Sequence, residues 1–161
     1  MHAVACYVHT PFCAIKCDYC NFFSNVRREG EGAVYFDGLS AEIDHHRRRG
    51  RLDDQTFDTL YLGGGTPTAF EPGELRLLVQ SLRDALHFVP GAEITSEANP
   101  ESLTADSAAL LRDLGFNRIS IGAQSFHDDE LKALSRPHDA AAITAAVRSA
   151  RQSGFTTLSL D

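Results

Sequence analysis

The sequence predicts an α/β fold in which helices cover a sheet of five parallel strands. Runs rich in β-branched and aromatic residues alternate along the chain with segments whose apolar residues recur at helical spacing. The links between these segments are short, which is typical of right-handed strand–helix–strand crossovers in a parallel sheet. From this pattern alone, the five strands could form a doubly wound sheet or most of a barrel. At 161 residues, the chain has the length of one domain.

After the first strand and a cysteine-rich loop, the expected helices and strands alternate, except that two helices separate the last two strands. Strands are placed at residues 4–8, 57–62, 93–97, 118–121 and 155–160, and helices at residues 34–49, 73–87, 104–114, 128–134 and 139–153. The second helix shows the pattern best, because Leu75, Leu78 and Leu82 fall on one face. Gly115 and Gly154 directly follow two other helices, at the position where glycine commonly ends a helix. The last strand has no helix after it, so we expect a truncated core that fills residues 1–161.

The composition is that of an ordinary soluble globular protein, with 43% hydrophobic and 23% charged residues. The formal net charge of −7 argues against a protein that binds nucleic acid mainly through phosphates. No apolar run approaches the roughly 20 residues needed to cross a bilayer. The N-terminus lacks the basic and apolar regions of an export signal. We therefore expect a cytoplasmic protein with no nucleic-acid partner.

All four cysteines lie within the first twenty residues, which favours a metal or cluster site over a disulfide framework. Cys13, Cys17 and Cys20 have the spacing C-x3-C-x2-C. Three thiolates can bind three irons of a [4Fe–4S] cluster and leave the fourth iron open to another ligand. Cys6 lies upstream on the first expected strand, so we do not count it as a fourth ligand.

Three other interpretations of these cysteines remain open at this point. A zinc ion would require a fourth ligand, which His9 could supply. Cys17 and Cys20 could form a redox dithiol, although that motif normally stands without a third cysteine. The cysteines could also simply pack in the interior.

Polar and glycine-rich segments follow the other expected strands. They are the turn Gly63-Gly64-Gly65, together with Glu97, Gln124 and Asp161. Parallel α/β folds build their sites at the carboxyl ends of their strands. The sequence therefore predicts a functional site that joins these residues to the cysteine loop.

Four sequence blocks resemble one family of radical S-adenosylmethionine (SAM) proteins, the oxygen-independent coproporphyrinogen III oxidase family. The blocks are Tyr-Val-His-Thr-Pro-Phe-Cys with the cysteine loop at 7–20, Leu-Gly-Gly-Gly-Thr-Pro-Thr at 62–68, Glu-Ala-Asn-Pro-Glu at 97–101, and Gly-Phe-Asn-Arg-Ile-Ser-Ile-Gly-Ala-Gln-Ser-Phe at 115–126. The resemblance covers nearly the whole chain. It implies a partial (β/α)6 barrel of the radical SAM type, with a [4Fe–4S] cluster and SAM as cofactors.

The resemblance also implies roles for individual residues. Cys13, Cys17 and Cys20 would bind the cluster. Tyr7 would approach the SAM carboxylate, and Tyr19 would lie against the adenine. The remaining SAM contacts would be backbone groups of Gly64, Gly65 and Thr66 with the methionyl amino group, and Glu97, Gln124, Arg136 and Asp161 with the ribose and the methionyl carboxylate. The cluster would then reduce SAM to start radical chemistry on a porphyrinogen propionate.

Two features resemble the haem-chaperone branch of the family more than the oxidase. The oxidase pattern places a fourth cysteine two residues after the third, where this sequence has Phe22. The oxidase also has a substantial N-terminal extension before the cluster loop. The chaperone branch binds haem as cargo and delivers it to respiratory proteins, which implies peripheral membrane association through those partners. The oxidase and a zinc-stabilised α/β module remain the alternatives.

A basic run at residues 45–51, His-His-Arg-Arg-Arg-Gly-Arg, falls where the first helix is expected to end. Cations at that end complement the helix dipole, so we expect a solvated helix terminus. A patch that binds anions is the alternative.

Overall fold

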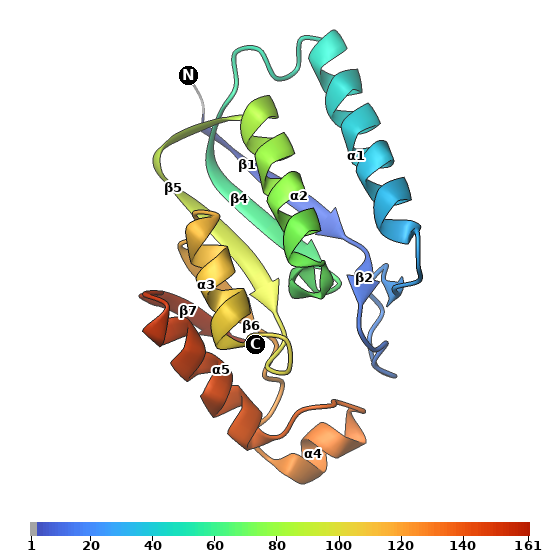
Figure 1. Cartoon of the computed structure of the whole chain (residues 1–161), viewed down its shortest axis with the longest axis vertical. Helices are drawn as coiled ribbons and strands as arrows, with labels where there is room; N and C mark the ends of the chain where they lie inside the picture. Colours follow the sequence, from blue (N-terminus) through green and yellow to red (C-terminus); the bar gives the residue numbers. More distant parts are fainter. Residues whose placement is uncertain (1–2) are drawn as a thin grey trace.

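Five strands form one parallel sheet in the computed structural model, which describes residues 3–161 (Figure 1). The sheet order is β1-β4-β5-β6-β7, and every neighbouring pair is parallel. The strands are β1 (Ala3–Thr10), β4 (Thr56–Gly64), β5 (His87–Ala98), β6 (Arg118–Ile121) and β7 (Thr157–Leu160). The predicted α/β class and the five parallel strands are confirmed.

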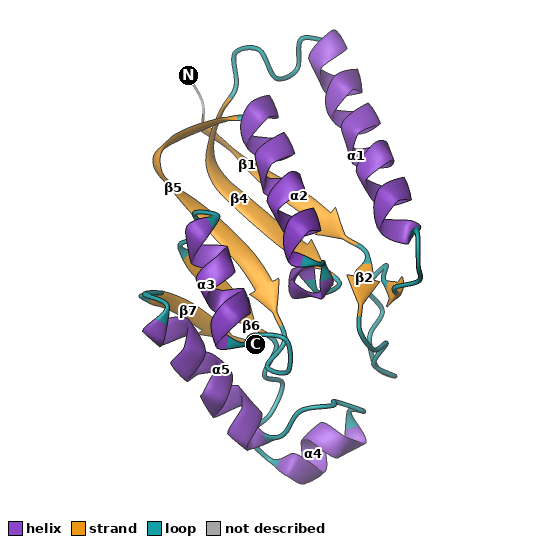
Figure 2. Ribbon diagram, in the orientation of Figure 1, coloured by secondary structure: helices purple, strands orange, loops and turns teal. Residues whose placement is uncertain are grey.

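The strand order follows the order of the chain, so the sheet never reverses direction. Right-handed crossovers then place the helices on one face of the sheet, as Figure 2 shows for the helices between the strands. The helices are α1 (Glu31–Arg48), α2 (Pro72–Ala85), α3 (Ala105–Asp113), α4 (Asp128–Ala133) and α5 (Ala140–Gln152). Of the two arrangements that the sequence left open, the sheet is therefore part of a barrel.

Local signals explain where the helices begin. At the start of α2, the side chains of Glu71 and Glu74 cap each other's backbone N–H groups. Thr104 and Ser107 form the same kind of reciprocal cap at α3. Asp139 accepts a hydrogen bond from a backbone N–H in the first turn of α5.

The core lies between the sheet and the helices. Its fully buried side chains include Leu62, Leu78, Leu111, Ile119 and Ile121. Removing such side chains from water is the main stabilising contribution, at roughly 25 cal/mol per Å² of apolar surface. Among residues 3–161, no helix is both long and apolar enough to cross a membrane.

Several boundaries differ from the sequence prediction; for example, α1 begins at Glu31 rather than at residue 34, and β1 extends to Thr10 rather than to residue 8. Strand β5 begins at His87, six residues earlier than expected, because the strand tolerates an irregularity around Gly91, whose φ is +81°. Strand β7 begins at Thr157, because buried Phe155 donates its N–H to the Ala150 carbonyl and still belongs to the end of α5.

One small sheet was not predicted. Strands β2 (Phe12–Cys13) and β3 (Asn25–Val26) pair in parallel on either side of the cysteine loop (Figure 1). They are two residues long, too short to show a strand pattern in the sequence. The pair fixes both ends of the loop next to the carboxyl end of β1.

Candidate functional site

The carboxyl ends of the strands surround a pocket of about 370 Å³. The site residues that the sequence predicts line this pocket, with the exceptions of Tyr7 and Gly63. The lining includes Cys13, Cys17, Tyr19, Cys20, Gly64, Gly65, Thr66, Glu97, Gln124, Arg136 and Asp161. The topology of the sheet therefore brings together groups that are spread over nearly 150 positions of the chain.

The cysteine loop forms one wall of the pocket. Its three thiols are free, with Cys17 buried and Cys13 and Cys20 partly exposed. The loop turns tightly where Cys20 donates its N–H to the Cys17 carbonyl at 3.1 Å. Among residues 3–161, no group of three or more His, Cys, Asp or Glu side chains is arranged to hold a single metal ion.

Two cations lie beside the thiols. Lys16 Nζ is 4.0 Å from Cys20 Sγ and donates to the Phe22 carbonyl at 2.8 Å. Arg136 Nη1 is 3.4 Å from Cys17 Sγ. Positive donors next to sulfur stabilise the negative charge of a thiolate-bound centre. The chemistry of this wall therefore suits a cluster bound by three thiolates.

The glycine turn after β4 packs too closely against β1 to carry side chains. A Cβ atom on Gly65 would collide with the carbonyl oxygens of Thr10 and Phe12, and Gly64 has a φ of +109°. Gly65 donates its N–H to the Thr10 carbonyl at 2.6 Å, and Thr66 donates its N–H to the Phe12 carbonyl at 2.7 Å. Since these N–H groups are already used, a ligand would meet the carbonyl oxygens of the turn, of which the Thr66 oxygen also accepts the Ala69 N–H at 2.8 Å. Carbonyl oxygens suit an ammonium group.

Glu97 lies at the end of β5 and faces the glycine turn. Its Oε2 accepts the Gly64 N–H at 3.0 Å, and its Oε1 accepts the Tyr61 hydroxyl at 2.8 Å. Burial, followed by the hydrogen bond and negative charge of Glu97, raises the pKa of Tyr61 to about 12. Tyr61 therefore stays protonated and acts as a donor that orients the carboxylate. Each carboxylate oxygen keeps a lone pair for a ligand hydroxyl or ammonium.

Arg136 connects the cysteine loop to the sheet. Its Nη2 donates to Asn99 Oδ1 at 2.8 Å and to the Gly122 carbonyl at 2.9 Å. Asn99 in turn donates to Thr66 Oγ1 at 3.0 Å. Within residues 3–161, Arg136 Nε is a buried nitrogen with no hydrogen-bond partner. A partly buried guanidinium with an unused donor fits a ligand carboxylate.

Asp161 and Gln124 lie together after β7 and β6. Gln124 has a φ of +65°, and its N–H donates to the Asp161 carbonyl at 2.6 Å. Asp161 Oδ2 accepts the Ser120 hydroxyl at 2.8 Å. A non-glycine residue in the left-handed region costs free energy and is often found at functional sites.

The two predicted tyrosines lie in different surroundings. Tyr19 lines the pocket, where burial raises its pKa and the nearby Arg136 lowers it. Tyr7 donates to His9 Nδ1 at 3.1 Å and stacks on Tyr61. Because His9 Nε2 donates to the Phe23 carbonyl at 2.7 Å, both ring nitrogens of His9 are occupied by hydrogen bonds.

The sequence did not single out three residues that support the site. They are Lys16, Tyr61 and Asn99. Asn99 follows a predicted strand, so its position was a usable signal. Tyr61 precedes the glycine turn within a strand, where an aromatic residue is ordinary, and Lys16 is an ordinary loop residue.

Comparisons with known proteins identify relatives of this chain. The sequence model described as "Radical SAM superfamily" matches residues 7–160. A protein named heme chaperone HemW from Haemophilus influenzae is 33% identical over 158 residues, which cover 96% of this chain and 41% of that protein. A protein named oxygen-independent coproporphyrinogen III oxidase from Salmonella typhimurium is 36% identical over 156 residues, which cover 96% of this chain and 34% of that protein.

A solved structure agrees with the fold. The coproporphyrinogen III oxidase HemN of Escherichia coli superposes with a TM-score of 0.89 at 34% identity, over 99% of this chain and 36% of that one. The chain therefore spans about 34 to 41% of the length of these relatives.

Proposed function

The chain belongs to the radical SAM superfamily, and from that premise we propose that residues 1–161 are part of a core that binds a [4Fe–4S] cluster on Cys13, Cys17 and Cys20. Membership of the superfamily implies this cluster and SAM as cofactors. Three free thiols on one wall, with Lys16 and Arg136 beside them, support the ligand assignment. When bound, the cluster supplies the electron that reduces the sulfonium centre of SAM and starts radical chemistry.

The remaining pocket residues bind and orient SAM in this proposal. The carbonyl oxygens of Gly64, Gly65 and Thr66 accept hydrogen bonds from the methionyl ammonium group. Arg136, with its unused Nε, pairs with the methionyl carboxylate. Glu97, Gln124 and Asp161 hydrogen-bond the ribose and the methionyl polar groups, while Tyr19 packs against the adenine and Tyr7 approaches the carboxylate from the side of β1.

The proposed biological role is that of a haem chaperone. Relatives named heme chaperone HemW are 33 to 35% identical over nearly the whole chain. The observation that carries the choice is Phe22, which replaces the fourth cysteine of the oxidase pattern and lies on the wall of the pocket. In this role the protein binds haem as cargo and passes it to haem-requiring respiratory proteins, and it meets the membrane only through those partners.

Oxygen-independent coproporphyrinogen III oxidase is the second candidate. The 36% identity to the Salmonella oxidase and the superposition on HemN favour it. In that case, radical chemistry would act on a porphyrinogen propionate. The two candidates share the cluster and the SAM site. They differ in the role of the protein, which is haem delivery in the first and oxidation of a porphyrinogen in the second.

Anaerobic reconstitution followed by three measurements tests the proposal. We expect iron and sulfide in equal amounts, an EPR spectrum of the reduced cluster that changes when SAM is added, and saturable binding of haem. Zinc without sulfide would instead support the zinc-stabilised module. Consumption of coproporphyrinogen in the presence of SAM would favour the oxidase.

A further inference from the structure

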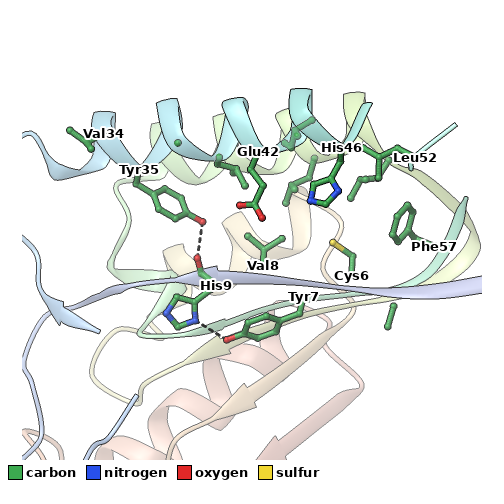
Figure 3. A pocket seen from close by; sticks show the side chains of 16 residues that line it. Cys6, Tyr7, Val8, His9, Val34, Tyr35, Glu42, His46, Leu52 and Phe57 are labelled. Carbon is green, nitrogen blue, oxygen red and sulfur yellow. Dashed lines mark hydrogen bonds between the residues drawn. The ribbon is translucent and has the colours of Figure 1, made fainter. Parts of the chain in front are cut away.

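A second and larger hollow of about 790 Å³ lies between helix α1 and strand β1 (Figure 3). It shares no lining residue with the pocket of the cysteine loop. We call it the α1–β1 groove. Its walls are mainly apolar, and they include Val8, Leu39, Ile43, Leu52, Phe57, Leu82 and Leu86. This volume falls within the range of small-molecule sites, and apolar walls are typical of sites for flat hydrophobic ligands.

Two side chains that bind iron in other proteins face each other in the groove. His46 projects from α1, and the Cys6 sulfur points toward it from β1 (Figure 3). Both residues are partly buried. Burial raises the pKa of the Cys6 thiol, so this thiol remains neutral and behaves as part of the wall. A neutral imidazole is a common axial ligand of haem iron, which makes His46 the ligand on this wall.

Positive charge gathers beside the groove, in the segment between the lining residues His46 and Leu52. Arg47 and Arg48 lie in the last turn of the helix, and Arg49 and Arg51 follow it. Arg47 donates to the Asp84 carbonyl on α2 at 2.7 Å, which fixes this end of α1 against α2. The chain as a whole carries a net charge of −7, so this basic run opposes the overall charge. A ligand with carboxylates would complement it.

We propose that the α1–β1 groove binds haem, with the ring between the apolar walls, His46 as the axial ligand and the propionates on the basic run at residues 47–51. Three features of haem match three features of the groove: a flat apolar ring, an iron with open axial positions, and two carboxylates. Glu42 also lines the groove, and its carboxylate points into it one helical turn before His46 (Figure 3), so in this proposal the propionates face away from Glu42 toward the basic run. This inference rests on the proposed chaperone function and assigns its cargo site.

The test titrates the cluster-loaded chain with ferric haem in the absence of oxygen and follows the Soret band. In parallel, metal-free protoporphyrin IX is titrated by fluorescence, because it has the same ring and propionates but no iron. The variant His46→Ala is compared with the matched control His45→Ala. His45 is the preceding residue on α1, is exposed and does not line the groove.

We expect His46→Ala to weaken haem binding by about tenfold or more and to shift the Soret band, as the loss of a metal ligand does. Its affinity for protoporphyrin IX should stay that of the parent chain. His45→Ala should leave both affinities unchanged. The double variant Arg48→Gln/Arg49→Gln should lower the affinity for both haem and protoporphyrin IX and reduce the salt dependence of binding.

The outcomes separate this inference from the proposed function. If the parent chain binds haem and His46→Ala binds it as His45→Ala does, with an unchanged Soret band, the groove assignment is wrong and the chaperone function stands. If the parent chain shows no saturable haem binding, both are overturned. Circular dichroism of each variant shows whether a lost affinity reflects a lost fold.

Discussion

The two hollows of this protein are built in different ways. The pocket at the cysteine loop is polar, and its groups are held by hydrogen bonds between distant segments, such as those from Arg136 to Cys17 and to Asn99. The α1–β1 groove is mainly apolar and lies at the edge of the sheet, where α1 faces β1 and residues of α2 and β4 complete the walls; the Tyr35 hydroxyl donates across it to the His9 carbonyl at 3.0 Å. Strand ends therefore position the groups of the first site, whereas the packing of side chains from several elements shapes the second.

The sharpest test of this difference compares cysteines from the two regions. Cys17→Ser should abolish cluster assembly, because one of only three proposed ligands is lost. Cys6→Ser should leave assembly unchanged, because Cys6 lines the groove and not the pocket. Iron and sulfide content after anaerobic reconstitution measures both variants. Equal loss of iron in the two variants would contradict the assignment.

A smaller effect is expected at the residue that ties the pocket together. Arg136→Gln removes the charge beside Cys17 and the donor that we assign to the SAM carboxylate. A hydrogen bond to a charged group contributes about 1.5–3 kcal/mol, so SAM affinity should fall roughly tenfold to a hundredfold. Equilibrium dialysis with labelled SAM measures this change.

The control for Arg136 is Arg148→Gln, an exposed arginine on α5 that does not line the pocket. It should bind SAM as the parent chain does. If Arg136→Gln also binds SAM normally while iron content is kept, Arg136 has no role at the carboxylate.

The smallest expected effect concerns two tyrosines, one in each region. The pKa of Tyr61 beside the pocket and of Tyr35 in the groove is raised from 10.0 to about 12, first by burial. Below about pH 10 both hydroxyls are protonated in the folded and in the unfolded chain, and their contribution to the free energy of unfolding is complete. Between about pH 10 and about pH 12 only the folded chain keeps these protons, so the contribution is lost as the pH rises. The free energy of unfolding should therefore decline across this range, and Tyr61→Phe and Tyr35→Phe should each flatten the decline.

Urea unfolding at about pH 9 and about pH 11 measures this effect. Tyr61→Phe should in addition weaken SAM binding slightly, because Glu97 loses the donor that orients it. Tyr35→Phe should leave SAM affinity unchanged, because Tyr35 lines the groove and not the pocket. A SAM affinity that falls equally in both variants would remove the distinction between the two regions.

Much of the fold and of the pocket was predictable from the sequence, for a physical reason. The spacing of Cys13, Cys17 and Cys20 is local, and the carboxyl ends of parallel strands must share one edge, so Glu97 and Asp161 could be placed together without coordinates. Tyr61 could not be recognised, because its role depends on a hydrogen bond to a strand 36 positions away. The short β2 and β3 pair was missed because two residues carry no periodicity.

The groove was not predictable at all. Cys6 and His46 are separated by the cysteine loop and most of α1, and no spacing rule relates them. The basic run was correctly expected at the end of the first helix, but the apolar walls beside it come from several elements. Only their packing creates the hollow.

The cysteine loop contacts residues after α4, which the ribosome synthesises much later than the loop itself. Asp18 accepts the Ser135 hydroxyl across 117 positions, and Cys17 meets Arg136 across 119. A ribosome that adds 5–20 residues per second takes roughly 6–24 seconds to cover that distance. During this interval the nascent thiols exist without their guanidinium neighbour. The cysteine loop therefore gains this neighbour only after Arg136 has been synthesised, so the complete pocket forms late in synthesis.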